Sequence, residues 1–126
     1  MFPVSIKGVL FTEARECVLA LNDRNEWELP GGRIEVGESP ELCLQREFQE
    51  ELSININAEH LLDAHLFEVI PGRHVFIVTY GCSLSGAFLP VVSEEHSQIR
   101  AFPVSALPTN LPFGYRRSIE AWHARL

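Results

Sequence analysis

Three glutamates, Glu47, Glu50 and Glu51, are spaced so that an α-helix would carry all three on one face. Like charges this close repel one another unless a cation neutralises them. Mg²⁺, with Mn²⁺ as a possible substitute, prefers the carboxylate and water oxygens that such a face offers. The spacing therefore predicts a divalent-cation site, although an isolated pattern of this kind is more often a solvated helix face.

The residues around the glutamates favour the cation site over the solvated face. Two glycines, Gly31 and Gly32, precede the predicted helix, Glu38 lies just before its start, and Arg46 lies inside it. A charge-assisted pair between Glu38 and Arg46 would fix the loop against the helix and orient the acidic face. We therefore expect Glu38 and Arg46 to support the site.

The helix itself has clear start signals. Ser39 is a good N-cap residue, and Pro40 suits the first helical position. Leu44, Phe48 and Leu52 recur at four-residue spacing, which gives one apolar stripe. These features predict a helix that begins after Ser39 and ends near Leu52.

The segment from Gly32 to Ile54, GRIEVGESPELCLQREFQEELSI, resembles the Nudix box of MutT-like hydrolases. The matching positions are Gly32, Glu38, Arg46, Glu47, Phe48, Glu50, Glu51 and Ile54. The resemblance implies an α/β fold, a Nudix-type α/β/α sandwich with a mixed β-sheet, in which the box forms a loop-helix-loop catalytic motif.

The resemblance also implies an activity and a set of site residues. The activity is Mg²⁺-dependent hydrolysis of a phosphoanhydride bond in a nucleoside diphosphate linked to another moiety. Nucleoside triphosphates, ADP-ribose, sugar nucleotides and dinucleoside polyphosphates all remain open as substrates. By analogy, Glu47, Glu50 and Glu51 bind the metal with a backbone carbonyl near Gly31 or Gly32, while Arg46 and Glu38 complete the catalytic site as structural supports.

A loop outside the box offers a further ligand. Nudix proteins often recruit another glutamate as metal ligand or general base, and the candidates here are Glu94 and Glu95, of which we assign Glu95 to the metal. An equally good interpretation is that both glutamates are solvated loop residues with no role in the site. His60, His74 and His96 have no recognisable partner in the sequence and are given no role.

Substrate contacts are harder to assign than metal ligands. A nucleoside needs an apolar or aromatic slot, and its phosphates need cationic donors. Trp27 and Arg73 are the residues we select, with Phe113 as a further possibility. Packing in the core is the alternative for Trp27.

One position departs from the box. Ser53 stands where the pattern ends in glycine, which commonly adopts the left-handed conformation after a helix. Serine could accept that conformation at a cost of about 1 kcal/mol, or the loop could turn differently. We expect a weakened enzyme at most, because no metal ligand is lost.

Composition limits the function classes. The chain has 126 residues, 46% hydrophobic and 21% charged, which suits one domain spanning residues 1–126. Its net charge of −7 disfavours binding to nucleic acids or anionic lipids, so we expect a small nucleotide as partner. Cys17, Cys43 and Cys82 are widely spaced, and no signal peptide or membrane span is evident. A cytoplasmic protein with reduced cysteines is expected, as a monomer or homodimer.

The remaining segments predict a sheet covered by helices. Strands are expected at 3–12, 16–21, 61–70, 74–84 and 99–104, with a C-terminal helix at 115–126. The first two should form a pair joined by a tight turn at 12–15. Two other functions remain open: a non-catalytic Nudix-like nucleotide sensor, and an acidic interaction domain in which the box is coincidental.

Overall fold

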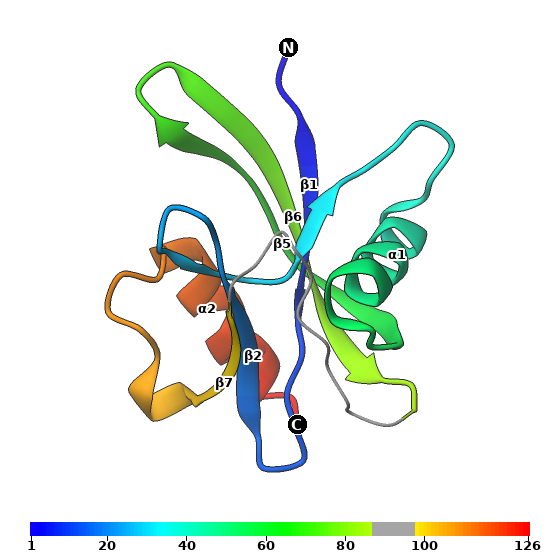
Figure 1. Ribbon diagram of the computed structural model, residues 1–126, viewed down its shortest axis with the longest axis vertical. Helices are drawn as coiled ribbons and strands as arrows, with labels where there is room; N and C mark the ends of the chain where they lie inside the picture. The colour runs from blue at the N-terminus through cyan, green and yellow to red at the C-terminus, as the bar shows by residue number, and fades with distance from the viewer. Residues whose placement is uncertain (87–97) are drawn as a thin grey trace.

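The structure is a computed structural model that describes residues 1–86 and 98–126. It contains two α-helices and seven strands in these ranges (Figure 1). In chain order the elements are β1 (Val4–Val9), β2 (Glu16–Leu21), β3 (Trp27–Glu28), β4 (Gly31–Arg33), α1 (Pro40–Leu52), β5 (Ile56–Ile70), β6 (Arg73–Leu84), β7 (Gln98–Pro103), a short 3₁₀ helix (Val104–Ala106) and α2 (Phe113–His123). The helix predicted from the Ser39 cap and the apolar stripe is present as α1.

The strands form two sheets. The larger has the order β4-β1-β6-β5, and it is mixed because β1 and β6 run parallel while the outer pairs are antiparallel. The smaller, β3-β2-β7, is antiparallel. Figure 1 shows α1 beside the larger sheet and α2 on the other side, near β2 and β7. The predicted class, a mixed sheet between helices, is confirmed.

The predicted pairing of the first two strands is confirmed only next to the turn. There the Thr12 N–H donates to the Glu16 carbonyl and the Val18 N–H to the Leu10 carbonyl, around an antiparallel bridge between Phe11 and Cys17. Farther from the turn the two segments separate, and β1 and β2 belong to different sheets. Both edges of β1 are already taken, since Lys7 pairs with Gly31 on β4 and with Thr79 on β6. A turn motif indicates where a chain reverses, but it does not indicate which distant strands will form hydrogen bonds with the segments on either side of the turn.

Side chains on β1 alternate between two apolar clusters. Ile6 packs with Phe48 and other residues of α1, whereas Val9 belongs to the cluster that includes Ile119 of α2. The two clusters lie on opposite faces of the larger sheet. The odd-numbered positions of β1 therefore face away from α1, which places Lys7 on the α2 side.

Several element boundaries differ from the prediction, among them the end of β1, which lies at Val9 rather than at residue 12. β5 begins at Ile56 rather than at residue 61, because Ile56 is buried against α1 and Ala58 packs beside it, although polar residues separate them. α2 begins at Phe113, directly after Pro112, and ends at His123. Neither helix within the described ranges is long and apolar enough to cross a membrane.

Candidate active site

Two glycines bring β4 close to both its neighbours. Gly31 has a φ of +143°, and a side chain there would overlap the backbone carbonyl of Ile6. At Gly32 an added Cβ would overlap the carboxylate of Glu47. The absence of side chains therefore lets the Glu47 carboxylate lie directly against the β4 backbone.

Both ends of α1 are capped. The Ser39 hydroxyl accepts a hydrogen bond from the Leu42 N–H at 3.2 Å, as the sequence predicts. At the other end Ser53 has φ 56° and ψ 35°, and its N–H donates to the Gln49 carbonyl at 3.0 Å. Serine thus adopts the left-handed conformation that the box normally assigns to glycine, and the loop does not turn differently.

Arg46 forms ion pairs with several glutamates of the acidic face and of the loop before it. Its Nε donates to Glu38 Oε2 at 2.5 Å and its Nη2 to Glu38 Oε1 at 3.0 Å, so the expected pair is present and bidentate. Nη2 also donates to the Arg33 carbonyl at 3.2 Å. Nη1 reaches Glu47 at 3.0 Å and Glu50 at 3.3 Å. One guanidinium therefore connects β4, the following loop and two of the predicted ligands.

These contacts set the charge states of the pair. The hydrogen bond from Arg46, assisted by the backbone N–H of Glu35, lowers the pKa of Glu38 to about 2. The same pairing with Glu38 raises the pKa of Arg46 above its already high ordinary value. Both groups are charged at neutral pH, which keeps the loop tied to the helix.

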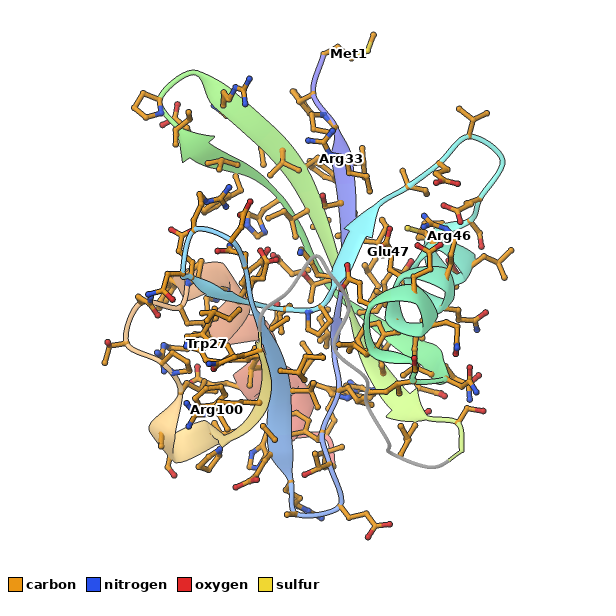
Figure 2. All side chains as sticks on the ribbon, viewed as in Figure 1. Met1, Trp27, Arg33, Arg46, Glu47 and Arg100 are labelled. Atoms are coloured by element: carbon orange, nitrogen blue, oxygen red, sulfur yellow. The ribbon has the colours of Figure 1, made fainter. Side chains whose placement is uncertain are left out.

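The three glutamates differ in exposure along the face. The Glu47 side chain is 12% exposed and that of Glu50 58%, whereas Glu51 is buried. Figure 2 shows Arg46 and Glu47 at the side of α1 that faces β4. Within residues 1–86 and 98–126, no three ligating side chains converge on a single point, because Arg46 holds Glu47 and Glu50 toward itself.

The face nevertheless fits a divalent cation. Its donors are the hard carboxylate oxygens of Glu47, Glu50 and Glu51. The contact between Glu47 and the β4 backbone also brings the predicted carbonyl partner at Gly31 or Gly32 close to the carboxylates. A bound cation would compete with Arg46 for the oxygens of Glu47 and Glu50, and these are the groups that would hold it.

A cleft of about 800 Å³ is lined by β1, β4, the β5–β6 hairpin and α2. Five basic side chains line it, in a chain whose net charge is −7. They are Lys7, Arg24, Arg33, Arg73 and His74. Apolar walls come from Phe67, Val75 and Tyr115, among others. The cleft thus combines cations for phosphates with apolar surface for a base or sugar.

Lys7, Arg24 and Arg33 are basic cleft residues that sequence reasoning missed, and Lys7 is the buried one. Its ammonium lies 3.9 Å from a Glu28 carboxylate oxygen. Burial lowers the pKa of Lys7, but Tyr115, Glu28, Glu51 and Glu47 together outweigh that effect and raise it. A single charged residue within the mostly apolar strand VSIKGV was the available signal.

A second cavity of about 340 Å³ adjoins the cleft and shares Phe67, Ile77 and Tyr115 with it. Its wall includes Asp63 and His65, whose Oδ2 and Nδ1 atoms are 2.6 Å apart. Both residues lie on the same face of β5, two positions apart. Neither residue is predicted from the sequence, where their spacing on a strand is the only signal.

The predicted substrate residues are separated by the fold. Arg73 lines the cleft, and Phe113, which is largely exposed, lines the adjoining cavity. Trp27 lines neither; its ring packs against Phe102 at 5.0 Å, and Arg100 lies over it at 5.7 Å (Figure 2). The loop carboxylates Glu94 and Glu95 fall outside the described residues.

The three cysteines are free and buried. Burial raises the pKa of Cys43 to about 11 and that of Cys82 to about 12, and it raises the pKa of Cys17 as well. Thiols with raised pKa values are poor nucleophiles at neutral pH. Cys17 and Cys82 therefore serve as small core residues. Cys43 also lies in the core but contacts the site, because its Sγ is 3.8 Å from the Gly32 carbonyl oxygen and 3.9 Å from Arg46 Nη2.

Comparison with known proteins agrees with the geometry. A NUDIX domain model matches residues 1–122. The chain is 48% identical over 59 residues to an 8-oxo-dGTP diphosphatase of Proteus vulgaris, a match covering 42% of this chain and 50% of that protein. It is 32% identical over 93 residues to a MutT-like protein of Streptomyces ambofaciens, covering 73% of this chain and 58% of the relative. The chain thus spans about half the length of these curated relatives.

A solved structure has the same fold. The MutT protein from Methanosarcina mazei Go1 superposes with a TM-score of 0.81 at 20% identity, covering 98% of this chain and 94% of that one. With a glycine-flanked loop, an Arg46-centred acidic helix and a domain model that covers nearly the whole sequence, the chain belongs to the Nudix family. Within that family it resembles the MutT-like members.

Proposed function

We propose that this protein hydrolyses a phosphoanhydride bond in a nucleoside diphosphate linked to another moiety, with a divalent cation as cofactor. The observation that carries the proposal is the acidic face of α1, where Glu47 lies against Gly32 of β4. The next residue of β4, Arg33, lines the cleft together with four other basic side chains. An acidic protein needs such a local device to accept a polyanionic substrate.

In this proposal Glu47, Glu50 and Glu51 hold the cation, Mg²⁺ or Mn²⁺. The bound ion would neutralise the diphosphate and lower the pKa of the attacking water. Arg46 pairs with Glu47 and Glu50 until a cation competes for their oxygens, and Glu38 fixes Arg46 by its bidentate pair. The protein then contributes mainly positioning and charge.

The basic cleft favours a highly charged substrate. Arg33 and Arg73 line the cleft, and no ion pair with either is found among the described residues. A nucleoside triphosphate offers more negative charge to such groups than a sugar nucleotide does. Because one relative is named an 8-oxo-dGTP diphosphatase, we propose nucleoside triphosphates, ordinary or oxidised, as the first class to test.

A substrate screen tests the proposal. Purified protein is incubated with Mg²⁺ and with nucleoside triphosphates, ADP-ribose or sugar nucleotides, and the products are identified along with released phosphate or pyrophosphate. We expect turnover that EDTA abolishes and that added Mg²⁺ or Mn²⁺ restores. Turnover that survives the chelator would rule out the metal-dependent mechanism, and absence of turnover in every arm would favour a nucleotide sensor.

A further inference from the structure

Lys7 occupies an unusual position for a charged side chain. It lies in the middle of β1, between partner strands β4 and β6, and only 8% of it is exposed. Its neighbours along the strand, Ile6 and Gly8, face α1, so Lys7 faces the cleft. Burying an ammonium costs free energy unless opposite charges or strong hydrogen bonds compensate.

The surrounding groups keep Lys7 charged, and the ion pair that it forms among the described residues, with Glu28, is a long one. The Glu28 oxygen is 3.9 Å from Nζ, beyond hydrogen-bond distance. Tyr115 and Glu28 contribute most to raising the pKa of Lys7 against the effect of burial, followed by Glu51 and Glu47. The ammonium therefore lies within electrostatic reach of both the acidic face of α1 and the α2 wall.

The sheet places a second polar group beside Lys7. Thr79 is the β6 partner of Lys7, and paired residues of parallel strands project from the same face. The Thr79 hydroxyl is buried, and no described residue forms a hydrogen bond with it. The next strand continues the row with Asp63, which lines the adjoining cavity. Lys7, Thr79 and Asp63 thus form a polar row across the larger sheet, on the face away from α1, and this row leads to that cavity.

We propose that the Lys7 ammonium binds a phosphate oxyanion of the substrate, so that Lys7 is a further catalytic-site residue. This inference rests on the proposed function. A substrate whose cleaved bond lies at Glu47 and Glu51 and whose remainder extends toward the cavity at Tyr115 would pass over Lys7. A phosphate oxygen there supplies the close anionic partner that Glu28, at 3.9 Å, does not.

The competing explanation is structural: Lys7 could serve only to balance the charge of Glu28. A double variant, Lys7→Met with Glu28→Gln, separates the two explanations because it removes both charges and leaves no buried charge of the pair uncompensated. Lys7→Met alone and Lys7→Arg accompany it. Arg125→Met is the control for loss of one positive charge, since Arg125 lies at the C-terminus and lines neither cavity.

Binding of AMP and of inorganic pyrophosphate is measured by titration calorimetry with Mg²⁺ present, together with melting temperatures. We expect the double variant to fold and to bind at least one probe about tenfold or more weakly, in line with loss of a hydrogen bond to a charged group. Lys7→Arg should recover part of the affinity, and Arg125→Met should bind as wild type does. A loss for AMP places Lys7 at the nucleoside-linked phosphate, and a loss for pyrophosphate places it at the released group.

Unchanged affinity of the double variant for both probes would overturn the proposal, as would a wild type that binds neither. These results are distinguishable from failure of the proposed function, because the titrations do not require turnover. A wild type that binds AMP through Lys7 but hydrolyses nothing leaves Lys7 as a phosphate ligand in a sensor. A wild type that turns over nucleotides, with a double variant of equal KM and affinity, refutes the role of Lys7 alone.

Discussion

The acidic helix and the cleft beside it are built in different ways. Residues 31–53 form a continuous segment in which Arg46 connects groups no more than 13 positions away in sequence. The cleft draws on β1, β4, β5, β6 and α2, and Lys7 and Tyr115 are more than a hundred positions apart in the chain. A local segment can be recognised from spacing, whereas a long-range assembly depends on how strands pair.

The difference separates two parts of the function. The local segment carries the groups proposed for the chemistry, whose geometry tolerates little variation. The cleft carries the groups proposed to choose the substrate, and its apolar wall belongs to the cluster on the α2 side of the sheet rather than to the one that packs on α1. Variants that perturb one region and leave the other intact therefore test whether the two roles are separate.

Gly32→Ala should have the largest effect of the three variants that perturb the local segment. A Cβ at this position would overlap the Glu47 carboxylate and displace it from the β4 backbone. Because the displaced group is the end of a flexible side chain, the fold should persist, while kcat should fall about 10²-fold through misplacement of a ligand. Steady-state kinetics with a thermal melt would measure both effects, and an unchanged kcat would show that Glu47 has no role in the reaction.

Ser53→Gly should stabilise the protein by about 1 kcal/mol, since Ser53 has a positive φ that glycine adopts without strain. The melting temperature should rise by a few degrees, with a modest gain in metal affinity. Ser105→Gly is the matched control, because Ser105 lies in the short 3₁₀ helix and does not have a positive φ. That control should lower the melting temperature. A drop for Ser53→Gly as well would contradict the strain assigned to Ser53.

The pair between Glu38 and Arg46 should give the smallest effect, a dependence of stability on pH. The pKa of Glu38 is about 2 in the folded protein against an ordinary value of 4.5. Its contribution is therefore complete above pH 4.5 and is lost as the pH falls toward 2. Melts of wild type and Glu38→Gln from neutral to acid pH should show a difference that shrinks across this range. A difference that stays constant would mean that the pair does not depress the pKa of Glu38.

The sequence predicted those features that nearby residues determine. Ser39, Pro40 and the stripe ending at Leu52 locate α1, and the pair between Glu38 and Arg46 follows from spacing alone. The backbone conformation of Ser53 could not be predicted, because two conformations are compatible with serine at this position. The structure resolves that choice through a φ of 56°.

Features that depend on distant partners could not be predicted in the same way. The hairpin expected from β1 and β2 is limited to the residues next to the turn, because β6 and β4 occupy both edges of β1. The pairing of β1 with β4 and β6 also buries Lys7 in the wall of the cleft, which a single lysine in a mostly apolar strand does not indicate. Trp27 looked suitable for a base, but β3 places it against Phe102 instead.

The central claim is that the acidic face of α1 holds the catalytic cation, and Glu51→Gln tests it most directly. Glu51 is the most buried of the three carboxylates, and glutamine keeps its shape while removing the charge. Glu41→Gln, in the exposed first turn of the same helix, is the matched control. Mg²⁺ affinity by calorimetry, kcat and melting temperature are measured for all three proteins. We predict that Glu51→Gln loses at least about 10²-fold in kcat and binds Mg²⁺ more weakly, with no fall in melting temperature, while the control behaves as wild type. A Glu51→Gln protein that unfolds, or one whose rate and Mg²⁺ affinity stay within a few fold of wild type, would show that this carboxylate is structural and that the cation is held elsewhere.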